Sequence, residues 1–522
     1  MRRQAFGLAA ALAAVCVITP QQIDGQTARP NIVVIMLDDF DVASLERAVQ
    51  GGLAPNIKRY FRDEGYTFSN AFSTSTFGSP TRATFLTGQY PHNHFEIGGD
   101  PILGSTPKLN ESSTLATWLR AAGYRTSMVG RYLTGYGWFT PQTYIPPGWD
   151  DWYGLVDPTT WSTEKYVINA NGTLIDVGAA AETAGVEIHQ TDLLAYLSGA
   201  LIQQAPLFGR PFFAVVAPIV FNRERYPGPT TYNVCPDPSE PVFGGTYWGV
   251  AQKPPARHRG TVFGNLTAFA LPKPPSFNEE DISDKPEWAQ RNPRLTEFEI
   301  DCLQKRYWRK LETIKGIDDL VGHVMSQLTA IGALNKTVVV LTADAGDMDG
   351  EHRFPEKMPA YEPSMRIPLL IRLPGSTTPR TVSRLVLNTD LAPTIVNLAS
   401  AIPGVIFDGR SLVPLMQNPD LTSWRKVGLV EHAVGAAASG FGYPPSYLAL
   451  RTDAPAPRVF VRYPGITTGL NGELYDLGID PHQLQNLYTD PARAAEVSRL
   501  NLFTAALSTC RGFTCALIEN SY

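Results

Sequence analysis

The stretch 31-NIVVIML-37 decides the fold class of this 522-residue chain. A continuous run of apolar, mostly β-branched residues is typical of a strand that is buried on both faces, as the strands of parallel sheets are. The run ends in Asp38 and Asp39, and a second run of the same kind, 337-TVVVLTA-343, ends in Asp344. Because ligands bind beyond the carboxyl ends of such strands, these three carboxylates mark a candidate site.

The rest of the chain alternates strand and helix patterns. Runs at 211–218 and 366–375 predict further buried strands, and helical periodicity covers 191–204 and 300–332. This alternation predicts an α/β fold with a mostly parallel central sheet and helices on both faces. The segment from about 226 to 288 is dense in proline, glycine and aromatic residues, and we interpret it as a long excursion over the sheet edge that walls the site.

The sequence pattern divides the chain into three parts. Residues 1–28 combine two arginines, an apolar run and a polar tail, which predicts a secretory signal peptide and leader; a membrane anchor is the weaker alternative. Residues 29–420 hold the α/β pattern. Residues 421–522 change to short alternating strands and a closing helix near 490–508, which predicts a small C-terminal antiparallel subdomain.

Composition narrows the classes of function. A net charge of −5 gives no reason to expect nucleic-acid binding, which needs a strongly basic face. The chain offers no second long apolar stretch, so we expect no stable membrane insertion. Four glycosylation motifs, at Asn110, Asn171, Asn265 and Asn335, fit a secreted or secretory-pathway glycoprotein, although a chain of this length carries several by chance.

Four cysteines lie beyond the predicted leader: Cys235, Cys302, Cys510 and Cys515. An even number in a secreted chain favours disulfides, and four cysteines allow three pairings. The short spacing in 510-CRGFTC-515 favours a local bridge, which leaves Cys235 with Cys302; the alternative is that some are free, buried thiols. We expect no zinc at these residues, since no nearby histidine completes a zinc pattern.

Three carboxylates that converge at strand ends repel one another unless a cation neutralises them. A hard divalent cation with oxygen ligands is the usual solution, so Asp38, Asp39 and Asp344 are candidate metal ligands. The alternative is that these residues are helix caps or strand-end turns.

The stretch 75-STFGSPTRATFLTGQYPHNH-94 is the second candidate feature. Pro80 suits the start of a helix, because its missing N–H has no partner there in any case. Arg82 follows within the first turn, so the pattern predicts an anion-binding helix start. The residue at the head of this turn is Gly78, which has no side chain for chemistry.

These motifs, in this order and spacing, resemble the sulfatases of the alkaline phosphatase-like superfamily. The resemblance rests on RPNIVVIMLDD, GSPTRATFLTGQYPHNH, TADAGDMDG, NTDLAPTIVNLAS and GELYDLGIDPHQLQNLY, which span the chain beyond the leader. The motifs YPHNH, GRYLTGYG and PPGWDDWYGL are similar to the N-acetylglucosamine-6-sulfatases of that family. The resemblance implies an alkaline phosphatase-like fold and hydrolysis of sulfuric esters on sulfated sugars.

The resemblance also implies a nucleophile that this chain lacks. The family signature is C-x-P-x-R, whose cysteine, or sometimes serine, is oxidised to a formylglycine that attacks sulfur. Here the signature reads Gly78-Ser79-Pro80-Thr81-Arg82, so we expect no formylglycine. Ser79 and Thr76 are the nearest substitutes, but adjacent side chains on a helix point about 100° apart, so Ser79 should not occupy the vacant place without a shift in register. The alternative for both residues is that they cap the helix.

By the same resemblance, Asp38, Asp39 and Asp344 match three calcium ligands of the family. The fourth ligand is an asparagine in the family and is Ala345 here. Alanine supplies no oxygen, so we expect calcium to bind more weakly or with an additional water.

The remaining site residues are implied in the same way. Arg82 matches the arginine that pairs with nucleophile and metal, and Lys357 matches a lysine that contacts sulfate. Arg131 stands in place of a catalytic lysine, a change that keeps the charge but alters its geometry. Two histidines are replaced, one with Asn222 as the nearest polar candidate and one by Met348. The leaving alkoxide would thus lack its proton donor.

Two functions remain from these observations. The first is a secreted pseudoenzyme that binds a sulfated or otherwise anionic glycan, or a protein partner, through Arg82, Arg131 and Lys357. The basic run 256-ARHRG-260 either adds positive charge to this site or, as short basic runs more often do, forms solvated surface. The second is an active sulfuric ester hydrolase on sulfated sugars that uses an unconventional nucleophile or an activated water. The nucleophile, one metal ligand and both histidines are missing together, which favours the first.

Overall fold

The computed structural model describes residues 29–98, 108–219, 221–222, 251–434 and 444–522. The predicted leader, residues 1–28, and part of the predicted excursion, residues 223–250, lie outside the described residues.

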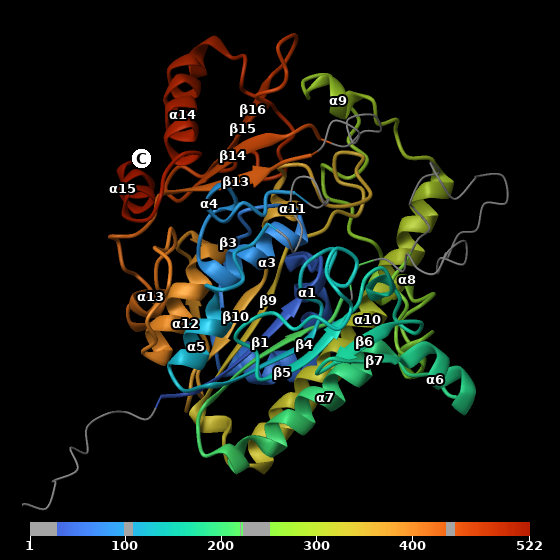
Figure 1. The fold of residues 1–522 in the computed structure, drawn as a ribbon. Helices are drawn as coiled ribbons and strands as arrows, with labels where there is room; N and C mark the ends of the chain where they lie inside the picture. The colour runs from blue at the N-terminus through green and yellow to red at the C-terminus, as the bar shows by residue number, and fades with distance from the viewer. Residues whose placement is uncertain (1–28, 99–107, 220, 223–250, 435–443) are drawn as a thin grey trace, which may run out of the picture.

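A large mixed sheet forms the centre of the protein (Figure 1). Its strands are β1 (Asn31–Leu37), β2 (Tyr66–Phe68), β4 (Arg125–Gly130), β5 (Asp151–Leu155), β6 (Val167–Ala170), β7 (Thr173–Asp176), β8 (Phe212–Ala217), β9 (Thr337–Ala343), β10 (Leu369–Arg372) and β11 (Arg380–Val382). The order across the sheet is β11-β2-β10-β9-β1-β8-β4-β5-β6-β7. Within this order, the five consecutive strands β9, β1, β8, β4 and β5 run parallel to one another. The predicted parallel sheet is therefore confirmed in its buried middle.

Most of the strand pairs towards the two edges of this sheet are antiparallel. The strand β10 runs antiparallel to β9 and β2, and β6 runs antiparallel to β5 and β7. The apolar run at 366–375 forms a strand of only four residues, Leu369–Arg372. The chain leaves β9 and enters β10 at the same end of these two strands, without crossing a face of the sheet, so β10 runs in the opposite direction. An apolar run does not reveal this direction.

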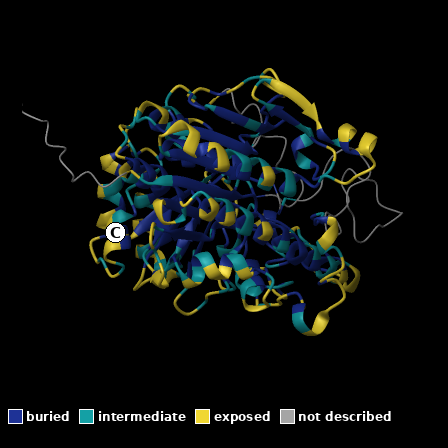
Figure 2. Ribbon diagram, turned by 90° about the horizontal axis from the view of Figure 1, so that it is seen from below, coloured by how far each residue is buried: buried dark blue, intermediate teal, exposed yellow. Residues whose placement is uncertain are grey.

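Helices cover both faces of the sheet, as predicted (Figure 1). One group holds α1 (Val42–Gln50), α7 (Gln190–Gln204) and α10 (Glu297–Ala330), and the other holds α3 (Gly78–Thr87), α5 (Leu115–Ala121) and α12 (Leu391–Ala399). The shorter helices are α2 (Pro55–Ile57), α4 (Pro91–His94), α6 (Val177–Ala184), α8 (Leu266–Phe269), α9 (Glu287–Gln290), α11 (Glu362–Met365) and α13 (Val413–Gln417). The middle strands of the sheet are almost entirely buried, whereas β7 at one edge is exposed, and most of the surrounding helices have an exposed side (Figure 2).

The C-terminal part forms a separate antiparallel sheet, as predicted. It consists of β13 (Val427–His432), β14 (Tyr447–Thr452), β15 (Arg458–Arg462) and β16 (Gly472–Asp476), followed by α14 (Ala494–Leu507) and α15 (Phe513–Ser521). A further two-stranded pair joins β3 (Ala71–Phe72) to β12 (Val386–Leu387). Buried residues of both parts of the chain, such as Phe72, Tyr90 and Tyr447, share one apolar cluster.

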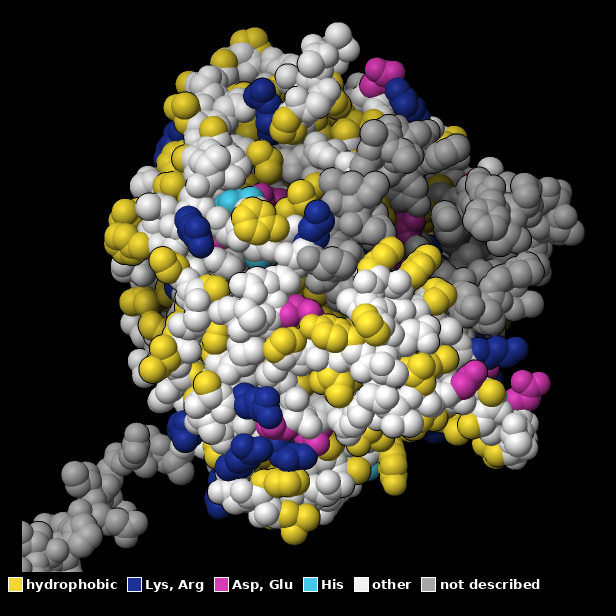
Figure 3. Space-filling model, in the orientation of Figure 1, with side chains coloured by type: hydrophobic (Ala, Val, Ile, Leu, Met, Phe, Trp, Pro, Cys, Tyr) yellow, Lys and Arg dark blue, Asp and Glu magenta, His cyan; other side chains and the backbone are white. Residues whose placement is uncertain are grey.

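Disulfides and surface features agree with the sequence where the structure describes them. The Cys510–Cys515 bridge is present, and Cys302 is also disulfide-bonded, while Cys235 lies outside the described residues. Over the described part of the chain, no helix is both long and apolar enough to cross a membrane. Acidic and basic side chains are scattered over the face seen in Figure 3, without a broad basic patch.

Candidate active site

The carboxylate cluster is built by two neighbouring parallel strands. Leu37 at the end of β1 lies opposite Ala343 at the end of β9, so Asp38 and Asp344 leave the sheet at the same edge. With Asp39 they form a group in which one carboxylate oxygen from each lies within 4.8 Å of the others. All three residues are buried. The structure thus brings together the three residues that the sequence nominated as metal ligands.

Arg82 reaches this cluster from the first turns of α3. The helix begins at Gly78, two residues before Pro80, and Arg82 is buried. Its Nε donates to Asp344 Oδ2 at 2.8 Å, and its Nη2 donates to Asp38 Oδ2 at 3.2 Å. The guanidinium therefore bridges the two carboxylates with charge-assisted hydrogen bonds.

Arg131 enters from the end of β4 and fills the space beside Gly78. Its guanidinium contacts Asp38 directly, lies 3.7 Å from Asp344 Oδ2 and stacks on Trp161, with Cζ 4.5 Å from the ring centre. A β-carbon added to Gly78 would lie 2.7 Å from Asp344 Oδ2 and 3.2 and 3.3 Å from the two terminal nitrogens of Arg131. A nucleophilic side chain at this position would therefore have to displace both neighbours.

Lys357 and Asn222 complete the cluster. The Lys357 ammonium group contacts Asp39. The Asn222 amide donates to Asp38 Oδ1 at 3.3 Å and to Asp39 Oδ2 at 3.1 Å. The predicted polar and charged residues thus form one group, in which three carboxylates face three cations and their formal charges balance.

Burial and neighbouring charges act differently on two of the carboxylates. Burial raises the pKa of Asp39 to about 6, Lys357 opposes this shift, and Asp344 reinforces it. Burial also acts to raise the pKa of Asp344, but Arg82, Lys357 and Arg131 outweigh it and hold that pKa below its ordinary value. Asp344 is therefore the more firmly ionised of the two.

Two residues that the sequence analysis missed position Lys357. Asp347 Oδ1 accepts a hydrogen bond from the Lys357 backbone N–H at 3.2 Å. Its other oxygen pairs with the buried Lys310 at 3.0 Å. Asp347 stands three residues after Asp344, and this closeness in sequence to a strand-end carboxylate could have marked it as a candidate site residue. Lys310 lies in the middle of the long helix α10, where no local pattern distinguishes it.

The two hydroxyl groups nearest Gly78, those of Ser79 and Thr76, form hydrogen bonds with groups outside the carboxylate–cation cluster. Ser79 Oγ donates to Glu96 Oε1 at 2.8 Å and accepts from the Thr134 backbone N–H at 3.2 Å. Thr76 Oγ1 donates to the Met358 carbonyl at 3.0 Å and lies 2.9 Å from His432 Nδ1. These partners support the prediction that Ser79 does not take the vacant place, and they hold the Thr76 hydroxyl elsewhere as well.

The basic run 256-ARHRG-260 and Met348 are the two remaining features that the sequence assigned to this site. The arginines of 256-ARHRG-260 are already paired, Arg257 with Asp192 and Asp319, and Arg259 with Glu164 and Glu187. This pairing favours the alternative for the run, an exposed surface segment that adds no free positive charge to the site. Met348, which replaces a histidine of the family, is buried in the apolar cluster shared by the two parts of the chain.

Glu96 gives the protein a dependence on pH that can be measured. Burial raises its pKa to about 8, and the hydrogen bond from Ser79 opposes part of the shift. Between about pH 4.5 and 8 the folded protein thus holds a proton that the unfolded chain has released, so its stability falls as the pH rises through this window.

We expect Glu96→Gln, which cannot ionise, to be as stable as the wild type near pH 5 and more stable near pH 8.5. At about 1.4 kcal/mol per pKa unit, the difference at the higher pH is at most about 5 kcal/mol. Urea unfolding at both pH values measures it. An equal difference between the two proteins at both values would contradict the assignment.

The fold and the site define a class of protein. A parallel-centred sheet that gathers carboxylates, two arginines and a lysine at its carboxyl edge is the framework of a hydrolase that binds anionic esters with the help of a metal. A sulfatase family model matches residues 30–401, and the chain belongs to the sulfatase family.

Known proteins agree with this assignment. The chain is 30% identical over 419 residues to human N-acetylglucosamine-6-sulfatase, covering 78% of this chain and 68% of the relative. It is 29% identical to an arylsulfatase of Volvox carteri, covering 93% and 76%. A protein solved in complex with its substrate D-glucosamine-2-N,6-O-disulfate superimposes with a TM-score of 0.67 at 22% identity, covering 91% and 97%. The resemblance drawn from the sequence is confirmed.

Proposed function

We propose that this protein is a secreted pseudo-sulfatase that binds a sulfated or otherwise anionic glycan without hydrolysing it. The observation that carries the proposal is the surroundings of Gly78. The position has no side chain to oxidise, and the Asp344 carboxylate and the Arg131 guanidinium stand where one would begin. The chain is similar to N-acetylglucosamine-6-sulfatase, which makes a 6-sulfated amino sugar the first candidate ligand.

The site keeps the parts that hold an anion. The side chains of Arg82, Arg131 and Lys357 converge at the carboxylate cluster, where an anion would bind, and the N-terminus of α3 presents backbone N–H groups beside them. Arginines form paired hydrogen bonds with sulfate oxygens more readily than lysines do, so the lysine-to-arginine change at 131 is compatible with binding.

A divalent cation fits the donor set. Asp38, Asp39 and Asp344 supply hard oxygen ligands, which calcium prefers. A half-turn of the Asn222 amide would present its Oδ1 to the same two carboxylates, and this oxygen would replace the one missing at Ala345. When bound, such an ion would attract an oxygen of the sulfate group. Arg82 and Lys357 would orient the anion beside it.

We expect Asn222→Ala to weaken calcium binding about tenfold or more. Titration calorimetry with calcium measures the affinity, and the luminescence lifetime of bound terbium in H₂O and D₂O counts coordinated waters. The variant should carry one additional water. Asn222→Asp, which keeps an oxygen, serves as the matched control. Unchanged affinity and hydration in Asn222→Ala would show that Asn222 is not a ligand.

Secretion is part of the proposal and rests on the described surface as well as on the leader pattern. The four glycosylation motifs, at Asn110, Asn171, Asn265 and Asn335, are all exposed. The Cys510–Cys515 disulfide also fits an oxidising compartment.

One observation favours the alternative, an active hydrolase. Thr76 and His432 form a hydroxyl–imidazole pair at 2.9 Å, but burial lowers the pKa of His432 to about 3, which keeps the ring neutral and makes it a weak base. The Thr76 hydroxyl is fully buried and also contacts Tyr447 and the Met358 carbonyl. These contacts favour a structural role that fixes the loop before α3.

Binding and turnover can be separated by calorimetry with 6-sulfated N-acetylglucosamine in the presence of calcium. The wild type should give a saturable binding isotherm and no continuing heat of reaction. Lys357→Ala should weaken the binding, and the unsulfated sugar should not bind. The absence of any binding by folded wild-type protein would overturn the proposed function.

A further inference from the structure

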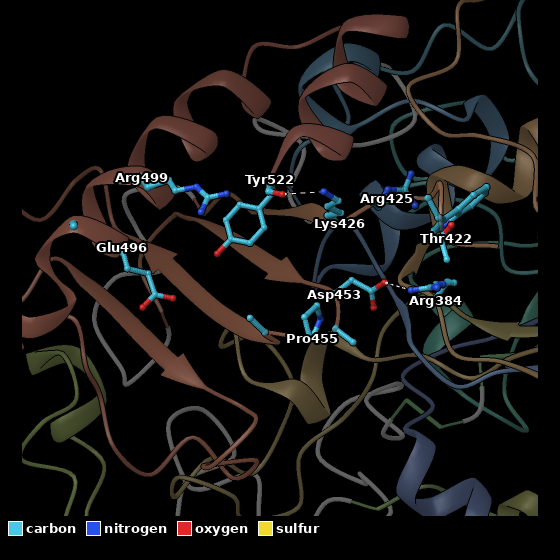
Figure 4. A pocket seen from close by; sticks show the side chains of 13 residues that line it. Arg384, Thr422, Arg425, Lys426, Asp453, Pro455, Glu496, Arg499 and Tyr522 are labelled. Atoms are coloured by element: carbon cyan, nitrogen blue, oxygen red, sulfur yellow. Dashed lines mark hydrogen bonds and ion pairs between the residues drawn. The ribbon is translucent and has the colours of Figure 1, made fainter. Parts of the chain in front are cut away.

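A second cavity lies in the C-terminal part of the chain, built from residues that the carboxylate–cation cluster does not use. Its volume is about 590 Å³, within the range of cavities that bind small ligands. Its walls come from the turn that follows β14, from α14, from the chain segments before β12 and β13, and from the residue that follows α15 (Figure 4). Arg384, Lys426 and Arg499 line it together with Tyr522.

The acidic side chains in the wall of this cavity already have cationic partners. Glu496 pairs with Arg458 at 2.9 Å and with Arg493 at 3.1 Å. Asp453 lies 3.8 Å from Arg384 and accepts a hydrogen bond from Asn70. These contacts reduce the negative charge that a ligand in the cavity would meet.

Two cations in the wall are held by Tyr522 and not by a carboxylate side chain. Lys426 Nζ donates to the Tyr522 backbone oxygen at 3.3 Å, and the Arg499 guanidinium lies 4.5 Å from the centre of the Tyr522 ring. Both cations are exposed. Across the described residues, neither has an ion pair with an acidic side chain, so no aspartate or glutamate competes with an anion for them.

A further arginine in the wall differs from these two. Arg425 is fully buried and bonded to Asp390 and Glu519, so it supports the wall and does not add free charge. The positive charge that faces the cavity therefore comes from Lys426 and Arg499, with Arg384 beside them.

We infer that this cavity is a second binding site, for a sulfated saccharide. Lys426 and Arg499 would hold sulfate oxygens through charge-assisted hydrogen bonds. The ring of Tyr522 and the side chain of Pro455 offer apolar surface to a sugar ring. Two sites on one molecule would hold a long sulfated polysaccharide more tightly than either site alone. The inference shares no residue with the proposed function of the first site.

The test is calorimetry with a heparin-derived disaccharide that carries sulfate groups, and with its unsulfated counterpart. The double variant Lys426→Ala/Arg499→Ala should lose one bound disaccharide per protein or bind it at least tenfold more weakly. Lys58→Ala/Arg59→Ala removes the same two charges from another exposed position and serves as the control. Near-ultraviolet circular dichroism should show that all variants are folded, since each altered side chain is exposed.

The outcomes separate the two sites. The loss or weakening of one bound disaccharide per protein in the double variant, with that disaccharide still bound by Arg82→Ala, supports the second site, whether or not the first site binds. Unchanged binding in Lys426→Ala/Arg499→Ala would overturn it. An equal loss in the control variant would show only non-specific attraction to surface charge and would overturn it as well.

Discussion

A Gly78→Cys variant, expressed where the cysteine of the sulfatase signature is oxidised to formylglycine, is expected to release no sulfate above the background of Arg82→Ala. The new side chain would start 2.7 Å from the Asp344 carboxylate and 3.2 Å from the Arg131 guanidinium, so these groups must move before a nucleophile can stand there. By the resemblance to the family, two histidines are also replaced, one of them by Met348, and the loss of a proton donor alone costs about 10²–10⁴-fold in rate.

Further substitutions test whether the missing groups explain the proposed inactivity. Adding Arg131→Lys, Ala345→Asn and Met348→His to Gly78→Cys introduces the residues that the resemblance to the family implies at these positions. We expect turnover to appear only when several of them are combined. The measurement is sulfate release by ion chromatography, with mass spectrometry to verify formylglycine at position 78. Robust turnover by the single variant would show that the nucleophile was the only missing part.

Arg82→Ala is expected to destabilise the protein by about 3–5 kcal/mol, since it removes one partner from a buried ion pair. Arg82 bonds to both Asp38 and Asp344, and both carboxylates are fully buried. Without the guanidinium, part of their charge has no compensation. Urea unfolding in the presence of a calcium chelator measures the loss.

Calcium provides the control for this prediction. A bound divalent cation compensates the same carboxylates, so the destabilisation by Arg82→Ala should shrink when calcium is added. Arg82→Lys, which keeps the charge but not the paired geometry, should fall between the wild type and Arg82→Ala. A loss below about 1 kcal/mol without calcium would contradict the account of the buried cluster.

The sequence predicted the carboxylate cluster because its causes are local. The buried runs before Asp38 and Asp344 form neighbouring parallel strands, and such strands end at one edge. The position of Arg82 followed from its place in the first turns of a helix. Each of these residues could be placed from its own strand or helix.

Other features depend on contacts between distant residues, and the sequence did not reveal them. The direction in which the Arg131 side chain points depends on Trp161, Asp38 and the open space at Gly78. The pairing of Arg257 with Asp192 joins residues that lie 65 positions apart. A short basic run cannot show whether its partners are elsewhere in the chain, so the sequence left both interpretations of 256-ARHRG-260 open.

The most direct test of the central claim is sulfate release by the purified protein. An aryl sulfate and 6-sulfated N-acetylglucosamine would be supplied with calcium, beside an active relative as the positive control. The account predicts no release above that of Arg82→Ala, from protein shown to be folded and to bind the sulfated sugar. Release by the wild type that disappears in Arg82→Ala would contradict it, because the site would then contain a working nucleophile in place of the missing one at Gly78.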